Sequence, residues 1–106
     1  MNNTIKILEE FIGNLGTDDI KAIIEDRKLE LDPGETIASI CDLYVEITSN
    51  NNNIKMANKS LEISKVFIGS LNYNIIKGLI NKYDMEYSTT TVFAILETLY
   101  ECLEIL

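Results

Sequence analysis

Carboxylates are the side chains of this sequence with the widest scope for chemistry. The 106 residues include seventeen Asp and Glu, nine Lys and Arg and no His, which gives a formal net charge of −8. Paired carboxylates can serve as a general acid and base, or hold a metal ion. In Glu9–Glu10 and Asp18–Asp19, however, the two neighbours point to different sides of a helix, so their carboxylates do not converge. The sequence also contains no D-x-D-x-D-G calcium loop.

The absence of histidine excludes several kinds of active site. It rules out a Ser-His-Asp triad, an imidazole base at neutral pH and a metal site with histidine ligands. The five glycines form no phosphate-binding fingerprint. We therefore predict a protein that is not an enzyme, with no catalytic residues, no metal and no cofactor.

The charge and hydropathy of the chain also restrict its partners. A chain with this excess of acids is poorly suited to gripping phosphate backbones, which requires clustered Lys and Arg. No apolar stretch is long enough to span a membrane, and the first residues lack the pattern of a signal peptide. These features predict a cytoplasmic protein that binds neither nucleic acid nor membrane directly.

The two cysteines, Cys41 and Cys102, form no CxxC pair. We predict that each is a reduced, buried thiol on a helix, since free cysteine behaves as a small apolar residue. A disulfide between them is the alternative, and it would require the two Cα atoms to lie within about 7 Å.

The sequence resembles itself at an offset of 56 residues. Phe11-Ile12-Gly13 aligns with Phe67-Ile68-Gly69, and Leu43-Tyr44 aligns with Leu99-Tyr100. Over residues 3–50, twelve of the 48 aligned pairs are identical. We interpret this as an internal duplication. The alternative is two unrelated helical segments with similar apolar spacing.

The proposed repeats cover residues 3–50 and 59–106, joined by an Asn-rich linker at 49–53. In the first repeat, apolar residues at three- and four-residue steps predict a helix over about 4–15, a helix over 17–28 capped by Thr17, and a helix over 33–48 after the capping signal Asp32-Pro33. We expect the third helix to direct inward Ile37, Ile40, Cys41, Tyr44 and Val45.

The second repeat has three matching helices: one over 54–71, one after Asn72 and one capped by Ser88. Glycine at both Gly13 and Gly69 suggests close helix approach. The predicted fold class is all-α: about six helices in one compact domain over residues 1–106, with the repeats packed around a pseudo-two-fold axis.

Charge differs between the two halves of the chain. Residues 1–50 carry eleven acids and four bases, a net charge of −7, whereas residues 51–106 carry six acids and five bases, a net charge of −1. Complementary charge speeds association and favours specific partners. We predict a partner-binding acidic face formed by Asp18, Asp19, Glu25, Asp26, Asp42 and Glu46. The alternative is a solvated face that only keeps the protein soluble.

The second half is richer in tyrosine, which is common at interfaces. The residues predicted to form an apolar and aromatic interface are Tyr73, Tyr83, Tyr87, Ile105 and Leu106. In a small helical domain, such tyrosines also often cap the edge of the core.

Two hypotheses for function follow from these features. The first is a small acidic protein that occupies a basic, nucleic-acid-binding surface of a partner protein. Inhibitors, immunity proteins, antitoxins and phage anti-defence factors commonly have this size and charge. The second is a non-catalytic helical adaptor or regulatory subunit that forms a homodimer or larger oligomer through its Tyr-rich second half.

Overall fold

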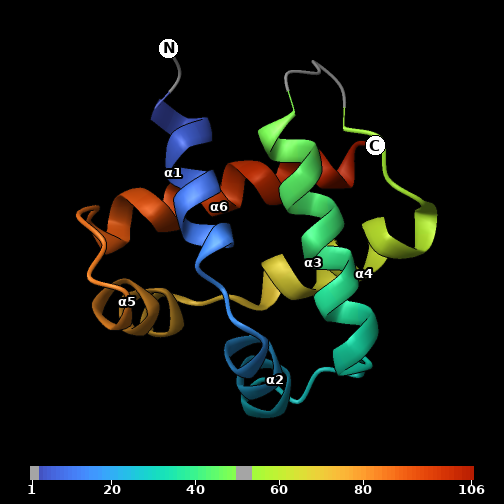
Figure 1. Cartoon of the computed structure of the whole chain (residues 1–106), viewed down its shortest axis with the longest axis horizontal. Helices are drawn as coiled ribbons and strands as arrows, with labels where there is room; N and C mark the ends of the chain where they lie inside the picture. Colours follow the sequence, from blue (N-terminus) through green and yellow to red (C-terminus); the bar gives the residue numbers. More distant parts are fainter. Residues whose placement is uncertain (1–2, 50–53) are drawn as a thin grey trace.

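The computed structural model describes residues 3–49 and 54–106, which form six helices (Figure 1). The helices are α1 (Asn3–Gly13), α2 (Thr17–Asp26), α3 (Pro33–Thr48), α4 (Asn58–Ser70), α5 (Tyr73–Lys82) and α6 (Thr89–Glu104). Within these described ranges there is no β-strand, so the predicted all-α class is confirmed. Of the predicted linker, only Ser49 lies inside the described residues.

Three helices begin at side-chain caps, and the sequence predicts two of them, Asp32 and Ser88. Asp32 precedes α3, and its carboxylate accepts a hydrogen bond of 2.9 Å from the backbone N–H of Glu35. Asn72 and Ser88 cap α5 and α6 in the same way. Each cap satisfies a backbone donor that the first turn of a helix leaves unpaired.

The start of α2 differs from the prediction that Thr17 would cap it. The N-cap residue is Gly16, which has no side chain to offer. The backbone N–H of Gly16 instead donates a hydrogen bond of 2.8 Å to the carboxylate of Asp19. Asp19 therefore holds the entry to α2 in place.

The predicted helix over 54–71 is too long, because α4 begins only at Asn58. Residues 54–57 are not helical, and within them Ile54 and Met56 are half-buried while Lys55 is exposed. Alternating exposure is typical of an extended strand-like segment. The apolar spacing that suggested helix at Ile54 thus serves an extended segment packed against the core.

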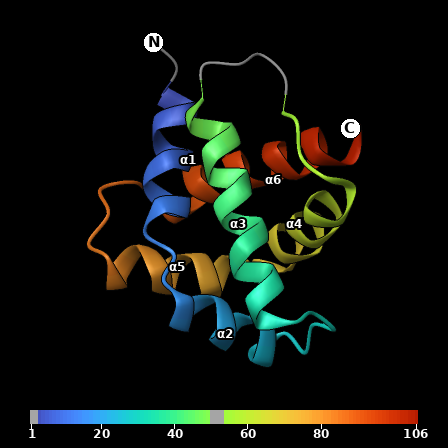
Figure 2. The ribbon, with the colours of Figure 1, turned by 45° about the vertical axis from the view of Figure 1, so that its right-hand side comes forward.

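The two long helices α3 and α6 carry most of the packing between elements. Helix α3 packs against α1, α2 and α4, whereas α6 packs against α4, α5 and α1. Figures 1 and 2 both show α6 passing behind α1 and α3. The buried apolar side chains of all six helices form one cluster, whose most enclosed members are Phe11, Leu43, Phe67, Ile76 and Leu103.

The buried face of α3 is rotated from the predicted one. The sequence suggested that Cys41, Tyr44 and Val45 point inward, but all three are exposed. The buried positions are instead Thr36, Ser39, Ile40, Leu43 and Ile47. The small residues on this face allow α4 to pack closely, since Ser64 of α4 is fully buried and its hydroxyl donates a hydrogen bond to the Ser39 carbonyl.

The prediction of buried thiols is wrong for both cysteines. Cys41 and Cys102 are exposed and free, so neither forms a disulfide.

Candidate functional site

The six acids of the predicted face fall into three groups. Asp18, Glu25 and Asp26 are exposed on α2 and make no hydrogen bond or ion pair within residues 3–49 and 54–106. Their surroundings are not purely acidic. Lys21 lies on the same helix, and the exposed Arg27 and Lys28 follow it directly.

The acids of α3 accept hydrogen bonds or an ion pair from residues 55–60 at the surface of the molecule. Asp42 accepts a hydrogen bond of 3.1 Å from the hydroxyl of Ser60, and Glu46 accepts one of 2.8 Å from the backbone N–H of Lys55. Glu35, two helical turns before Asp42 on the same face of α3, forms an ion pair of 2.6 Å with Lys59. These carboxylates therefore hold α3 against the start of α4 rather than lying ready for a partner.

Asp19 is not on the surface, because its side chain is only 6% exposed. In addition to the Gly16 N–H, its carboxylate accepts hydrogen bonds from the ammonium of Lys82 and the hydroxyl of Tyr83. Lys82 and Tyr83 lie at the end of α5, so this carboxylate joins the two halves of the chain. No local sequence pattern indicates this long-range pairing.

The pKa of Asp19 reflects these contacts. Burial acts to raise the pKa, but the hydrogen bonds from Lys82, Tyr83 and Gly16 together outweigh it. The pKa of this carboxyl therefore lies below its ordinary value. Asp19 remains ionised at neutral pH and acts as a structural anion.

Two of the predicted interface tyrosines contact acids of their own chain. Tyr83 binds Asp19, and the hydroxyl of Tyr87 lies 3.5 Å from the carboxylate of Glu10, where burial and this carboxylate raise the pKa of Tyr87. Tyr73 is exposed, and its ring packs edge-on against Phe93 with 6.5 Å between centroids. Of the remaining predicted residues, Ile105 and Leu106 are exposed.

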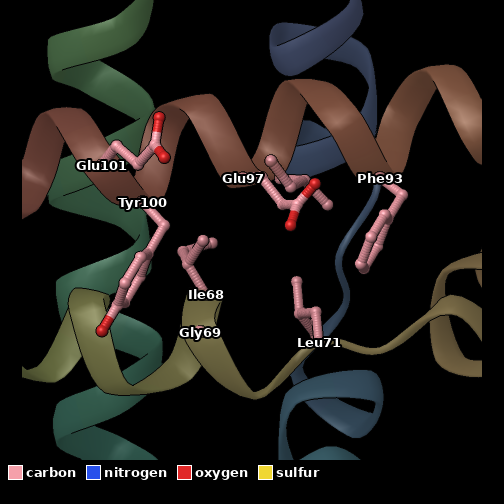
Figure 3. A pocket seen from close by; sticks show the side chains of 8 residues that line it. Ile68, Gly69, Leu71, Phe93, Glu97, Tyr100 and Glu101 are labelled. Atoms are coloured by element: carbon pink, nitrogen blue, oxygen red, sulfur yellow. The ribbon is translucent and has the colours of Figure 1, made fainter.

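A groove opens between α4 and α6, with a volume of about 300 Å³ (Figure 3). We call it the α4–α6 groove, and it is lined by Ile68, Gly69, Leu71, Phe93, Leu96, Glu97, Tyr100 and Glu101. Figure 3 shows Glu97 directed from α6 into the space above α4, between the rings of Tyr100 and Phe93. Glu101 lies over α6 at the rim. Both glutamates are exposed, and neither forms a hydrogen bond or ion pair with another described residue.

A second groove of about 440 Å³ lies between α1, the start of α2 and α3. We call it the α1–α3 groove, and it is lined by Ile12, Gly13, Leu15, Thr17, Ile20, Ile37, Ile40, Cys41, Tyr44 and Val45. Every residue that lines the α4–α6 groove lies 56 positions after one that lines this groove. Unlike its counterpart, the α1–α3 groove has no charged side chain in its lining.

Each groove has a tyrosine wall that depends on a glycine. A Cβ atom on Gly69 would lie 2.8 Å from Cε1 of Tyr100, and one on Gly13 would lie 3.0 Å from Cε1 of Tyr44. The close approach predicted at these glycines is therefore confirmed, and it is made by an aromatic ring.

Sequence reasoning missed Glu97 and Glu101 as candidate site residues. They lie in the half of the chain with little net charge, which hid them from a comparison of the two halves. Their signal was local, because they are four residues apart on one helix face. They also replace Cys41 and Val45 of the first half at the 56-residue offset.

The described residues contain no group of three Asp, Glu or Cys placed to hold a metal ion. None of the helices described is long and apolar enough to cross a membrane. Comparison with models of protein families finds no match, and comparisons with curated proteins and with solved structures find no significant one.

Proposed function

We propose that this protein is a non-catalytic binding protein that occupies a basic surface of a partner protein, in the manner of an inhibitor or antitoxin. The observation that carries the proposal is the charge of α6. This helix carries Glu97, Glu101 and Glu104 and no basic residue, and all three glutamates are exposed.

The contrast with α3 gives this charge its significance. Helix α3 also has three acids and no base, but each of them accepts a hydrogen bond or ion pair from the segment 55–60. The glutamates of α6 accept none within the described part of the chain. Of the three, Glu104 interacts electrostatically with Lys65 without forming an ion pair with it. Exposed carboxylates without an ion pair favour encounter with a positively charged surface. The proposed binding surface is therefore α6. Asp18, Glu25 and Asp26 form a separate acidic region outside it.

We also infer that the chain arose by duplication, with its halves packed around a pseudo-two-fold axis. In support, α5 and α6 have the bounds of α2 and α3 shifted by 56 residues. The backbone turns into the left-handed region after both α2 and α5, at Lys28 (φ 53°) and Asp84 (φ 51°). The packing also has this symmetry. If each helix of the first half is exchanged for its counterpart in the second, the contacts of α3 with α1, α2 and α4 become those of α6 with α4, α5 and α1.

The adaptor hypothesis has less support, because Tyr83 and Tyr87 contact acids of their own chain. The residues of that surface which remain exposed are Tyr73, Ile105 and Leu106. An oligomer formed through them would depend on apolar burial, which weakens little with salt. Salt dependence therefore separates the two hypotheses.

The experiment is affinity capture from a lysate of the source organism, at about 0.1 M and about 0.5 M salt, where screening of exposed charges increases. The bait is the wild-type protein, the triple variant E97Q/E101Q/E104Q, or the triple variant D18N/E25Q/D26N. The last variant is a matched control, because it also removes three negative charges, but from α2. Bound proteins are identified by mass spectrometry.

We expect an identified basic protein that wild type and the α2 variant capture at low salt. The α6 variant should lose it, as should wild type at high salt. Adding wild-type protein should also displace nucleic acid from this purified partner. Capture that survives the α6 substitutions, or recovery of only the protein's own chain at both salt concentrations, would contradict the proposal.

A further inference from the structure

At the positions that line both grooves, the main chemical difference is one strip of side chains. Of the eight positions that line both, Ile12, Gly13, Leu15 and Tyr44 have identical counterparts, and Ile40 is replaced by Leu96. The three remaining positions change their chemistry. They are Ile37, Cys41 and Val45 in the α1–α3 groove, and Phe93, Glu97 and Glu101 in the α4–α6 groove.

These three positions are four residues apart, so they follow one another along a single face of α3 or α6. The shared residues keep the tyrosine wall and the apolar floor in both grooves. The strip therefore changes what each groove can bind while leaving its walls in place. In the α4–α6 groove it supplies one aromatic ring and two carboxylates.

The chemistry of this strip selects among ligands. Carboxylates repel anions, and desolvating Glu97 beneath a purely apolar ligand would cost free energy without a compensating hydrogen bond. A cation avoids both penalties. The rings of Tyr100 and Phe93, which flank Glu97 in Figure 3, offer faces that attract a cation and can stack on a planar one.

We propose that the α4–α6 groove receives an arginine side chain of the basic partner. A guanidinium is planar and presents several N–H donors in a fixed fork, so it can donate to Glu97 while stacking against an aromatic wall. The ammonium of lysine is a compact, strongly hydrated charge without this planar surface. The groove's volume of about 300 Å³ is at the lower end for ligand pockets, which suits one side chain. This assignment rests on the function proposed above.

The test is a titration followed by ¹H–¹⁵N NMR with the peptide acetyl-Gly-Ser-Arg-Ser-Gly-amide. Peptides with citrulline or lysine in place of arginine are the comparison ligands, because citrulline has nearly the same shape without the charge. The proteins are wild type, E97Q and E30Q. Glu30 is exposed in the connection between α2 and α3, so E30Q removes one charge outside the groove.

We expect the arginine peptide to shift amide signals of residues 68–71 and 93–101. E97Q should weaken its affinity about two- to fivefold, the scale of one exposed ion pair. E30Q should change the affinity less than twofold, and the citrulline and lysine peptides should bind more weakly to wild type. The α1–α3 groove is the internal control, and its signals should stay in place.

Three results would overturn the assignment: unchanged affinity in E97Q, equal affinity for the three peptides, or equal shifts in both grooves. The outcome is distinguishable from failure of the proposed function. If the peptide test fails while a basic partner is still captured in a salt-sensitive way that depends on α6, the acidic surface acts without an arginine pocket. If the peptide binds as expected but no such partner is captured, the proposed function fails instead.

Discussion

The hydroxyl of Tyr83 should contribute measurably to stability, because it donates a hydrogen bond to an ionised carboxylate that is almost out of contact with water. The side chain of Asp19 is 6% exposed, so water cannot fully replace a lost donor. A hydrogen bond to a charged group contributes about 1.5 to 3 kcal/mol. Lys82 and the Gly16 N–H still bind Asp19 in Tyr83→Phe, which favours the lower part of this range.

We therefore expect Tyr83→Phe to lower the free energy of unfolding by about 1.5 to 2 kcal/mol. For a domain of this size, that corresponds to a fall in Tm of roughly 6 to 8 °C. The substitution isolates the effect of the hydroxyl because it keeps the aromatic ring. The ammonium of Lys82 lies over this ring, 5.1 Å from its centroid.

The assay is urea unfolding at pH 7 followed by circular dichroism, with Tyr73→Phe as the matched control. Tyr73 is exposed and its hydroxyl forms no hydrogen bond within the described residues, so its removal should change stability by less than about 0.5 kcal/mol. The dependence of stability on urea concentration should be the same in all three proteins. Equal stabilities for the two variants would refute the claim that Asp19 depends on Tyr83.

Two further predictions concern stability: one the charge of Asp19, the other two helical glycines. Because the pKa of Asp19 is lower in the folded than in the unfolded protein, its contribution is complete above the ordinary value of 3.8 and is lost as the pH falls through the folded value. Asp19→Asn should therefore be less stable than wild type at pH 7, with the gap narrowing in urea unfolding at pH 3 and below; a gap independent of pH would contradict this. Gly78→Ala in α5 should stabilise the protein by about 0.5 to 1 kcal/mol, since a Cβ there meets nothing within 4 Å. Gly69→Ala should stabilise the protein less, or destabilise it, because its Cβ would displace the ring of Tyr100. Thermal melts compare the two variants, and an equal rise in Tm for both would contradict this contact.

Local signals in the sequence predicted the helices well. Asp32, Asn72 and Ser88 mark helix starts because each side chain can satisfy a backbone donor only a few residues away. The information needed for such a cap is contained in four consecutive residues. The same holds for the glycine in α1 and in α4, whose cost within a helix pointed to close packing.

The errors arose where distant residues decide the outcome. Asp19 looks like a solvent-facing acid of a first helical turn until α5 brings Lys82 and Tyr83 to it across more than sixty positions. Likewise, the apolar residues around Ile54 fit a helical period, but contacts with α3 hold that segment extended. Neither partner can be identified from spacing within one helix.

Net charge was a poor guide to the candidate site for a related reason. The first half carries most of the acids, yet Asp19, Glu35, Asp42 and Glu46 all have partners within the chain. A carboxylate that already accepts a hydrogen bond from its own protein must give up that bond before it can serve a partner, which reduces its gain in free energy on binding.

Glu97 and Glu101 of α6 accept no hydrogen bond or ion pair within the described residues, so in the proposed complex they would give up none. Where acids lie relative to internal donors therefore matters more for partner binding than how many a segment contains. The capture experiment with matched triple variants compares the α6 glutamates with acids of α2 that also lack partners within the described residues but lie beside Lys21, Arg27 and Lys28.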